Sequence, residues 1–270
     1  MMASQVATLP ARRMIFQKGS AAAMFYTIIA ITYVVIFCLI SLVALPFTWI
    51  VRKIDTKKGD YMSLRYVQWG FRTVLFLGAQ KITVFGKEHI PADRPVLYVG
   101  NHRSIFDIIV SYAQVPTLTG YIAKESISRL PVISIWMKRL YCLFMKRDDL
   151  RQSLQIILTS IDYLKQGISI CIYPEGTRNK TEDPVQPFHA GSFKPAEKTG
   201  CPIIPMAITY SKPVFEDHLP VLYRTHIVLR FGAPVETASL SPEERKKLPD
   251  HVQNIIREMY LENLDFLKAN

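Results

Sequence analysis

Cysteine is scarce in this sequence, and the cysteines that it has lie far apart. Cys38, Cys142, Cys171 and Cys201 show no C-x-x-C spacing and no pattern typical of metal ligands. This argues against a disulfide-bonded scaffold and against a zinc site, so we expect no bound metal. A chain of this kind is typical of a reducing compartment, and we expect its main domain to face the cytoplasm.

Charge is absent from a long segment near the N-terminus. Residues 19–51 contain no Asp, Glu, Lys or Arg, and about 20 apolar residues are enough to cross a bilayer. A signal peptide has a shorter apolar region, of roughly 7 to 15 residues, so a retained membrane segment is the better interpretation. A buried core helix is the alternative, but it does not need so long an uncharged run.

Acidic residues are scarce in the first 80 positions, which carry nine Lys and Arg against Asp55 and Asp60 alone. Much of the net charge of +11 therefore lies beside the apolar segment, where basic groups attract anionic lipid head groups. Nucleic-acid binding is the rival explanation of a basic chain, but these residues form no known nucleic-acid motif. We expect membrane lipids as partners and no nucleic acid.

A second segment, residues 61–80, combines aromatic side chains with Arg65 and Arg72, which suits a helix at a membrane surface. Pro46 can break the first helix near its end. We therefore expect a membrane-inserting helix pair over residues 1–80, either a hairpin in one leaflet or a single crossing. Basic residues flank the apolar run on both sides, so the positive-inside rule does not choose an orientation.

After residue 80, short apolar runs alternate with helical periods. The β-branched and aromatic runs predict seven strands, at residues 82–85, 96–100, 118–123, 142–146, 169–173, 203–210 and 226–231. Between the fourth and fifth strands, spaced apolar residues and a terminal Gly167 predict an amphipathic helix. The alternation predicts an α/β domain over residues 81–270. Near its end, a capping box at Ser241 opens a helix, and Pro249 separates it from a last helix at 251–267.

The loop after the second predicted strand, in the sequence NHRSIFD, carries His102 and Asp107. Ligands of open α/β sheets bind at such strand ends. Two interpretations of this loop are open. In the first, Ser104 is a helix N-cap and Asp107 completes a capping box, which leaves His102 as an ordinary loop residue. In the second, Asp107 accepts a hydrogen bond from the imidazole, whose other nitrogen acts as a general base.

The turn after the fifth strand, with the sequence YPEGTR, is the second polar loop. It places Glu175, Gly176, Thr177 and Arg178 at the same sheet edge as His102. Taken alone, this segment is a β-turn with a solvated charge pair. No G-x-S-x-G elbow occurs in the sequence, which argues against a serine nucleophile.

Four blocks in this order resemble the glycerolipid acyltransferase family. They are NHRSIFD at 101–107, LFMKRDD at 143–149, YPEGTR at 173–178 and PIIPMAI at 202–208. The similarity covers roughly residues 80–235, and the apolar N-terminal helix pair is also similar to that of family members. In the second block, Lys146 stands where family members often have Asp or another small polar residue. The resemblance implies a mixed sheet of about seven strands flanked by helices.

The same resemblance implies the roles of the site residues. His102 is the base that deprotonates the glycerol hydroxyl of a lysophospholipid, and Asp107 orients and stabilises the imidazolium. Of the substrate-binding residues, Glu175 and Gly176 shape the acceptor site, and Arg178 binds the phosphate. The full set implied to bind substrate is Lys124, Lys146, Arg147, Glu175, Gly176, Thr177 and Arg178.

The resemblance also implies the reaction. The acyl group passes from an acyl thioester, carried by acyl carrier protein or coenzyme A, to 1-acyl-sn-glycerol-3-phosphate, which gives phosphatidic acid for phospholipid synthesis. No further cofactor is expected. Two alternatives stay open: acylation of a different lysolipid, such as a lyso-ornithine lipid, and a catalytically silent lipid-binding protein at the membrane.

Overall fold

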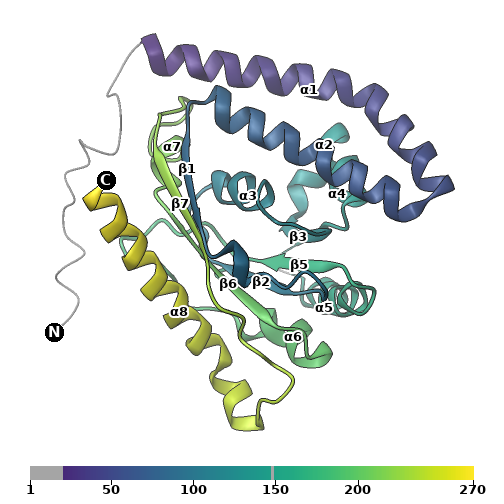
Figure 1. Cartoon of the computed structure of the whole chain (residues 1–270), viewed down its shortest axis with the longest axis vertical. Coiled ribbons are helices and arrows are strands. Elements are labelled where there is room, and N and C mark those ends of the chain that lie inside the picture. Colours follow the sequence, from purple (N-terminus) through teal and green to yellow (C-terminus); the bar gives the residue numbers. More distant parts are fainter. Residues whose placement is uncertain (1–20, 147–148) are drawn as a thin grey trace.

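A computed structural model describes residues 21–146 and 149–270 of the chain. A pair of long helices at the N-terminus lies across an α/β domain, and a long C-terminal helix lies on the other side of the sheet (Figure 1). Arg147, one of the predicted substrate-binding residues, lies outside the described residues. The same is true of the basic residues that precede the apolar segment.

The domain contains a seven-stranded mixed sheet in the order β1-β7-β6-β2-β5-β3-β4. All neighbouring strands pair in parallel except β6 and β7, which are antiparallel. The strands are β1 (Lys81–Phe85), β2 (Leu97–Gly100), β3 (Thr119–Lys124), β4 (Leu143–Met145), β5 (Ser169–Ile172), β6 (Ile203–Thr209) and β7 (His226–Phe231). The predicted fold class, with its seven strands, is confirmed.

The central strands β2, β5 and β6 are buried on both faces, which explains their nearly continuous apolar sequences. One core packs on each face of the sheet. The first face is covered by α2 (Thr56–Leu77), α3 (Ile105–Tyr112), α4 (Pro131–Arg139) and α7 (Lys212–Phe215). The second face is covered by α5 (Leu150–Lys165), α6 (Lys194–Thr199) and α8 (Pro242–Ala269).

The apolar segment forms α1 (Ala21–Ile54), which pairs closely with α2. Asp55 separates the two helices and caps α2 by accepting a hydrogen bond from the Lys58 backbone N–H at 3.0 Å. Within the described chain, α1 is the one helix long and apolar enough to cross a membrane. Its outer face is apolar and exposed, with Val43 at 72% exposure.

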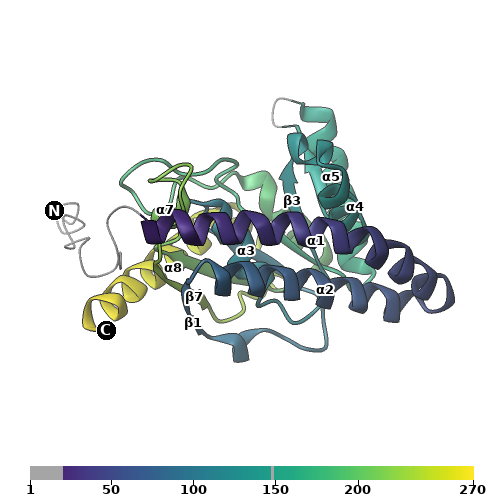
Figure 2. The ribbon, with the colours of Figure 1, turned by 90° about the horizontal axis from the view of Figure 1, so that it is seen from above.

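Polar contacts tie α1 to the domain near both of its ends. Near its start, the hydroxyl of Thr27 accepts a hydrogen bond from the Leu222 backbone N–H at 2.8 Å. Near its end, Arg139 donates to the carbonyl oxygen of Leu45 at 2.9 Å and to the Thr48 hydroxyl at 2.6 Å. Seen from above, α1 runs over the domain along most of its width (Figure 2). The helix therefore lies against the domain rather than projecting from it.

Two prolines predicted to interrupt helices do not do so. α1 continues through Pro46, and α8 continues through Pro249 to the end of the chain, so a separate last helix at 251–267 is wrong. A proline inside a helix costs about 3 kcal/mol or more. In α8, full burial of Val252 and Ile256 against the sheet offsets that cost. α1 absorbs its proline in a bend toward its C-terminal end (Figure 1).

Candidate active site

The predicted polar loops meet at one edge of the sheet. β6, β2 and β5 are neighbouring strands that run in the same direction, so their carboxyl ends lie together. β2 leads into the loop of His102, β5 leads into the loop of Glu175, and β6 leads into α7. The sequence blocks that lie far apart along the chain are therefore adjacent at this edge.

His102 and Asp107 form a hydrogen-bonded pair. Nδ1 of His102 lies 2.9 Å from Oδ2 of Asp107, because α3 begins between them and its first turn faces back toward the loop. The imidazole stacks on the ring of Tyr173, with 4.6 Å between the ring centroids. The His102 side chain is 13% exposed and that of Asp107 is fully buried. A ligand at this edge therefore reaches the imidazole but not the carboxylate.

The same carboxylate also caps α3. Oδ2 of Asp107 accepts hydrogen bonds from the backbone N–H groups of Arg103 at 2.6 Å and Ser104 at 2.7 Å. The Ser104 hydroxyl in turn accepts from the Phe106 backbone N–H at 3.0 Å. The capping box and the histidine–aspartate pair, which the sequence left as alternatives, are one arrangement. The cap fixes the carboxylate, and the carboxylate fixes the imidazole.

Asn101 and Tyr173 support this loop, although no sequence pattern predicted a role for either of them. The buried Asn101 amide donates to the Ile208 carbonyl oxygen at 2.9 Å, and its oxygen accepts from the Ile208 N–H at 2.8 Å. The Tyr173 hydroxyl lies 3.0 Å from Oγ of Ser111 on α3. A polar amide at the end of a buried strand signals a need for partners, but no local signal identifies the ring beneath the histidine.

Glu175 connects the second polar loop to the first. One carboxylate oxygen accepts a hydrogen bond from the His102 backbone N–H at 2.7 Å, and the other accepts from the Gln186 N–H at 3.3 Å. Burial raises the pKa of Glu175 to about 7, against the opposing effect of these two donors. The following Gly176 has a φ of +66°, and a Cβ there would lie 3.3 Å from the His189 ring.

We expect Glu175 to make the protein less stable as the pH rises from about 4.5 to about 7. In this range the folded protein retains the Glu175 proton and the unfolded chain releases it. The contribution to stability is therefore complete below pH 4.5 and lost as the pH rises through about 7, and it amounts to at most roughly 3 kcal/mol. Thermal unfolding of wild type and Glu175→Gln from pH 4 to 8 tests this, because the variant should gain stability relative to wild type across the window. A pH-independent difference would contradict it.

Arg178 is linked to the start of α3 through Glu216, a residue that no sequence pattern predicted. Its Nη1 lies 3.0 Å from Oε1 of Glu216, which follows α7. The same Oε1 accepts from the Ile105 backbone N–H at 2.8 Å, and the other oxygen accepts from the Ser104 hydroxyl. No sequence motif marks Glu216, since it lies outside all four blocks. Only the fold brings it to the site.

The remaining predicted residues in the described part of the chain have no hydrogen bond to the His102 pair. Thr177 is exposed in the turn beside Arg178, and the exposed Lys124 ends β3. Lys146 follows β4, three strands from β2, which is about 14 Å at the usual strand spacing. The structure thus brings together His102, Asp107, Glu175, Gly176 and Arg178, whereas the two lysines have no hydrogen bond to this group in the described part of the chain.

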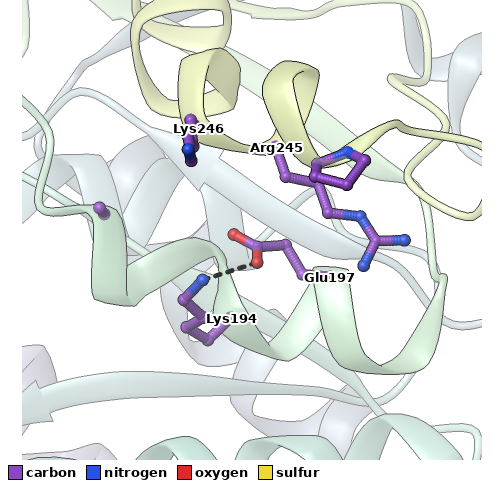
Figure 3. Close-up of a pocket in the computed structure, with 6 residues that line it drawn as sticks. Lys194, Glu197, Arg245 and Lys246 are labelled. Carbon is purple, nitrogen blue, oxygen red and sulfur yellow. Dashed lines mark hydrogen bonds and ion pairs between the residues drawn. The ribbon is translucent and has the colours of Figure 1, made fainter.

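A separate pocket lies between the start of α6 and the start of α8 (Figure 3). Charged side chains line it, and Nζ of Lys194 lies 2.7 Å from Oε2 of Glu197. None of the residues predicted from the sequence lines this pocket. The candidate active site is therefore the carboxyl edge of the sheet.

The part of the chain that resembles known proteins includes this sheet edge. The model of the acyltransferase family matches residues 81–209, a range that contains both polar loops. The 1-acyl-sn-glycerol-3-phosphate acyltransferase of Borreliella burgdorferi is 28% identical over 72% of this chain and 76% of its own length. The chloroplastic 1-acyl-sn-glycerol-3-phosphate acyltransferase BAT2 of Brassica napus is 34% identical over 47% of this chain, but this covers only 37% of the plant protein.

A solved structure shares the fold. The crystal structure of the 1-acyl-sn-glycerophosphate acyltransferase PlsC from Thermotoga maritima matches with a TM-score of 0.77. The match covers 89% of this chain and 97% of the other at 21% identity. The observed sheet with its flanking helices therefore follows an architecture that is already known.

Proposed function

We propose that this acyltransferase, whose residues 81–209 match the family model, acylates the sn-2 hydroxyl of 1-acyl-sn-glycerol-3-phosphate. The acyl group comes from a thioester of acyl carrier protein or coenzyme A, and the product is phosphatidic acid. The reaction uses this co-substrate and no other cofactor. The observation that carries the proposal is the contact of 2.9 Å between His102 and Asp107 at the sheet edge that also holds Arg178.

In the proposed mechanism, His102 acts as the general base. Its Nδ1 is held by Asp107, which leaves Nε2 to take the proton of the acceptor hydroxyl. The resulting oxygen nucleophile attacks the thioester carbonyl and forms a C–O bond. The C–S bond then breaks, and the thiolate takes the proton back from the imidazolium. No acyl-enzyme forms, and the buried Asp107 carboxylate stabilises the imidazolium while it exists.

Arg178 is proposed to bind the phosphate of the acceptor. Its side chain is 52% exposed, and a planar guanidinium forms paired hydrogen bonds with phosphate oxygens. Lys124, Lys146, Thr177 and Arg147 stay predictions for the same substrate or for the donor. Of these, Arg147 lies outside the described residues.

We expect Arg178→Ala to raise the KM for lysophosphatidic acid roughly 10- to 50-fold, which is the scale of lost hydrogen bonds to a charged group. The KM for the acyl donor should stay the same. Steady-state kinetics with each substrate varied in turn makes the comparison, and Arg94→Ala, at the exposed ion pair with Glu236, is a matched control. An unchanged acceptor KM would remove Arg178 from the phosphate site.

We propose that the helix pair holds the enzyme on a membrane, with the catalytic domain on the cytoplasmic side. The exposed apolar face of α1 supports membrane contact. α1 is hydrogen-bonded to the domain near both of its ends, at Thr27 and at Thr48. Insertion of α1 into one leaflet keeps these contacts, whereas a helix that spans the bilayer would have to separate from the domain, so insertion into one leaflet is favoured. The acceptor would then be drawn from the same lipid layer.

The experiment that tests the function is acyl transfer by the purified full-length protein in detergent. A radiolabelled acyl thioester is offered with lysophosphatidic acid, and separately with lysolipids that lack a terminal phosphate, including a lyso-ornithine lipid. Product with lysophosphatidic acid alone supports the proposal. Product with another acceptor alone overturns the proposed acceptor. If no combination of acyl donor and acceptor lipid gives product, the result indicates a catalytically silent lipid-binding protein.

A further inference from the structure

Glu216 joins the two halves of the candidate site. It lies between the start of α3, which carries the His102–Asp107 pair, and the loop that carries Arg178. Oε1 accepts hydrogen bonds from both the Ile105 N–H at 2.8 Å and Arg178 Nη1 at 3.0 Å. One carboxylate oxygen thus contacts the helix of the catalytic pair and the proposed phosphate ligand together.

The two partners of this ion pair differ in burial. The Glu216 side chain is 12% exposed and the Arg178 side chain is 52% exposed. Glu216 is held from the other side as well, because its second oxygen accepts from the Ser104 hydroxyl. Since a guanidinium has five N–H donors, the contact with Glu216 leaves most of the arginine free. Glu216 is therefore the fixed partner of this ion pair, and the Arg178 side chain extends from it into solvent.

The backbone around Glu216 is also well supported. Val214 in α7 is fully buried, and its carbonyl oxygen accepts from the Tyr223 N–H at 2.8 Å. Beside Glu216, Asp217 forms an ion pair with Lys212 at 3.1 Å. Because the backbone of Glu216 is held in place, its carboxylate sets the position of the Arg178 side chain, and Arg178 does not set the position of Glu216.

We propose that Glu216 is a positioning residue, which fixes Arg178 at a set distance from His102 and so makes the enzyme select acceptors with a terminal phosphate. This inference rests on the proposed function and deepens it. An acceptor reacts when its hydroxyl reaches His102 while its phosphate reaches Arg178. Without Glu216, the arginine samples other rotamers, and the phosphate loses its advantage over other head groups.

The test compares Glu216→Gln, Glu216→Ala and the control Glu236→Gln, whose carboxylate forms an exposed ion pair with Arg94. Glu216→Gln keeps one oxygen that accepts from the Ile105 N–H, but it removes the negative charge that faces Arg178 and replaces the oxygen that accepts from the Ser104 hydroxyl with an amide NH₂. We expect both Glu216 variants to raise the KM for lysophosphatidic acid by about tenfold, the scale of one hydrogen bond to a charged group. In Glu216→Gln, which keeps the hydrogen bond from Ile105, the KM for lysophosphatidic acid should rise by a larger factor than the KM for an acceptor that lacks a terminal phosphate. The control should match wild type, and thermal unfolding checks that each variant is folded.

A double-mutant cycle separates positioning from a merely structural role. If Glu216 acts through Arg178, then Glu216→Gln added to Arg178→Ala should not raise the acceptor KM further. Three results would each overturn the inference. The two substitutions could raise the acceptor KM by factors that multiply in the double variant, or Glu216→Gln alone could leave the acceptor KM unchanged. Glu216→Gln could also lower the acceptor KM, which would mark Glu216 as an anion that competes with the phosphate. Such a result with an active wild type leaves the proposed function intact. An inactive wild type would overturn both.

Discussion

His102→Ala should lower kcat for acyl transfer by about 10²- to 10⁴-fold, because general-base catalysis contributes on that scale. The variant loses the imidazole that is placed to take the hydroxyl proton, and the buried Asp107 carboxylate does not reach the substrate in its place. The acceptor and donor KM values should change little, because the proposed binding groups remain. Single-turnover transfer from a radiolabelled thioester measures a rate this low.

Two controls make the result specific to His102. The exposed His251 on α8 belongs to no predicted site, and His251→Ala should transfer acyl groups at the wild-type rate. Circular dichroism and thermal unfolding should show that His102→Ala is folded, because the imidazole is not part of the α3 cap. A folded His102→Ala protein with normal transfer would refute the assignment of the base.

Asp107→Asn should lower kcat by about 10²- to 10³-fold while leaving the loop in place. Oδ2 of Asp107 accepts three hydrogen bonds, from His102 and from the backbone of Arg103 and Ser104. An amide oxygen in the same position accepts all three. The loss is the negative charge, which no longer stabilises the imidazolium.

The surroundings of the other carboxylate oxygen of Asp107 predict that Asp107→Asn also lowers the stability of the protein. Oδ1 is buried without a hydrogen-bond partner among the described residues, and the amide NH₂ would take this place at a cost of about 1–3 kcal/mol. The unfolding temperature and kcat should therefore both fall in Asp107→Asn. The control Asp162→Asn, at an exposed position on α5, should change neither. A variant with reduced stability and wild-type kcat would show that Asp107 only caps the helix.

Local patterns in the sequence were sufficient for the elements of the fold. Each of the seven strands was predicted within two residues of its observed ends, because β-branched and aromatic runs mark strands and the central strands, buried on both faces, are continuously apolar. The start of α3 was also evident, since Ser104 and Asp107 have the spacing of a capping box. The apolar segment that forms α1 was clear from its lack of charge.

The prolines show where local patterns fail. Pro249 is a helix-breaking signal in the sequence, yet α8 continues through it because its apolar face is buried on the sheet. The free energy of that burial depends on strands that lie before residue 232 in the chain. A window of neighbouring residues does not contain this term.

The sequence by itself determined the elements, the four blocks and the chemical types of the site residues, because these follow from periodicity and from spacings within a few residues. Only the tertiary structure decided that Asp107 serves as both cap and imidazole partner, and that Lys146 lies three strands away from His102. It also brought Glu216 to Arg178 and to the start of α3. The physical reason is that strand order is set by pairing between distant segments, so the residues that meet at one sheet edge are chosen by the whole fold.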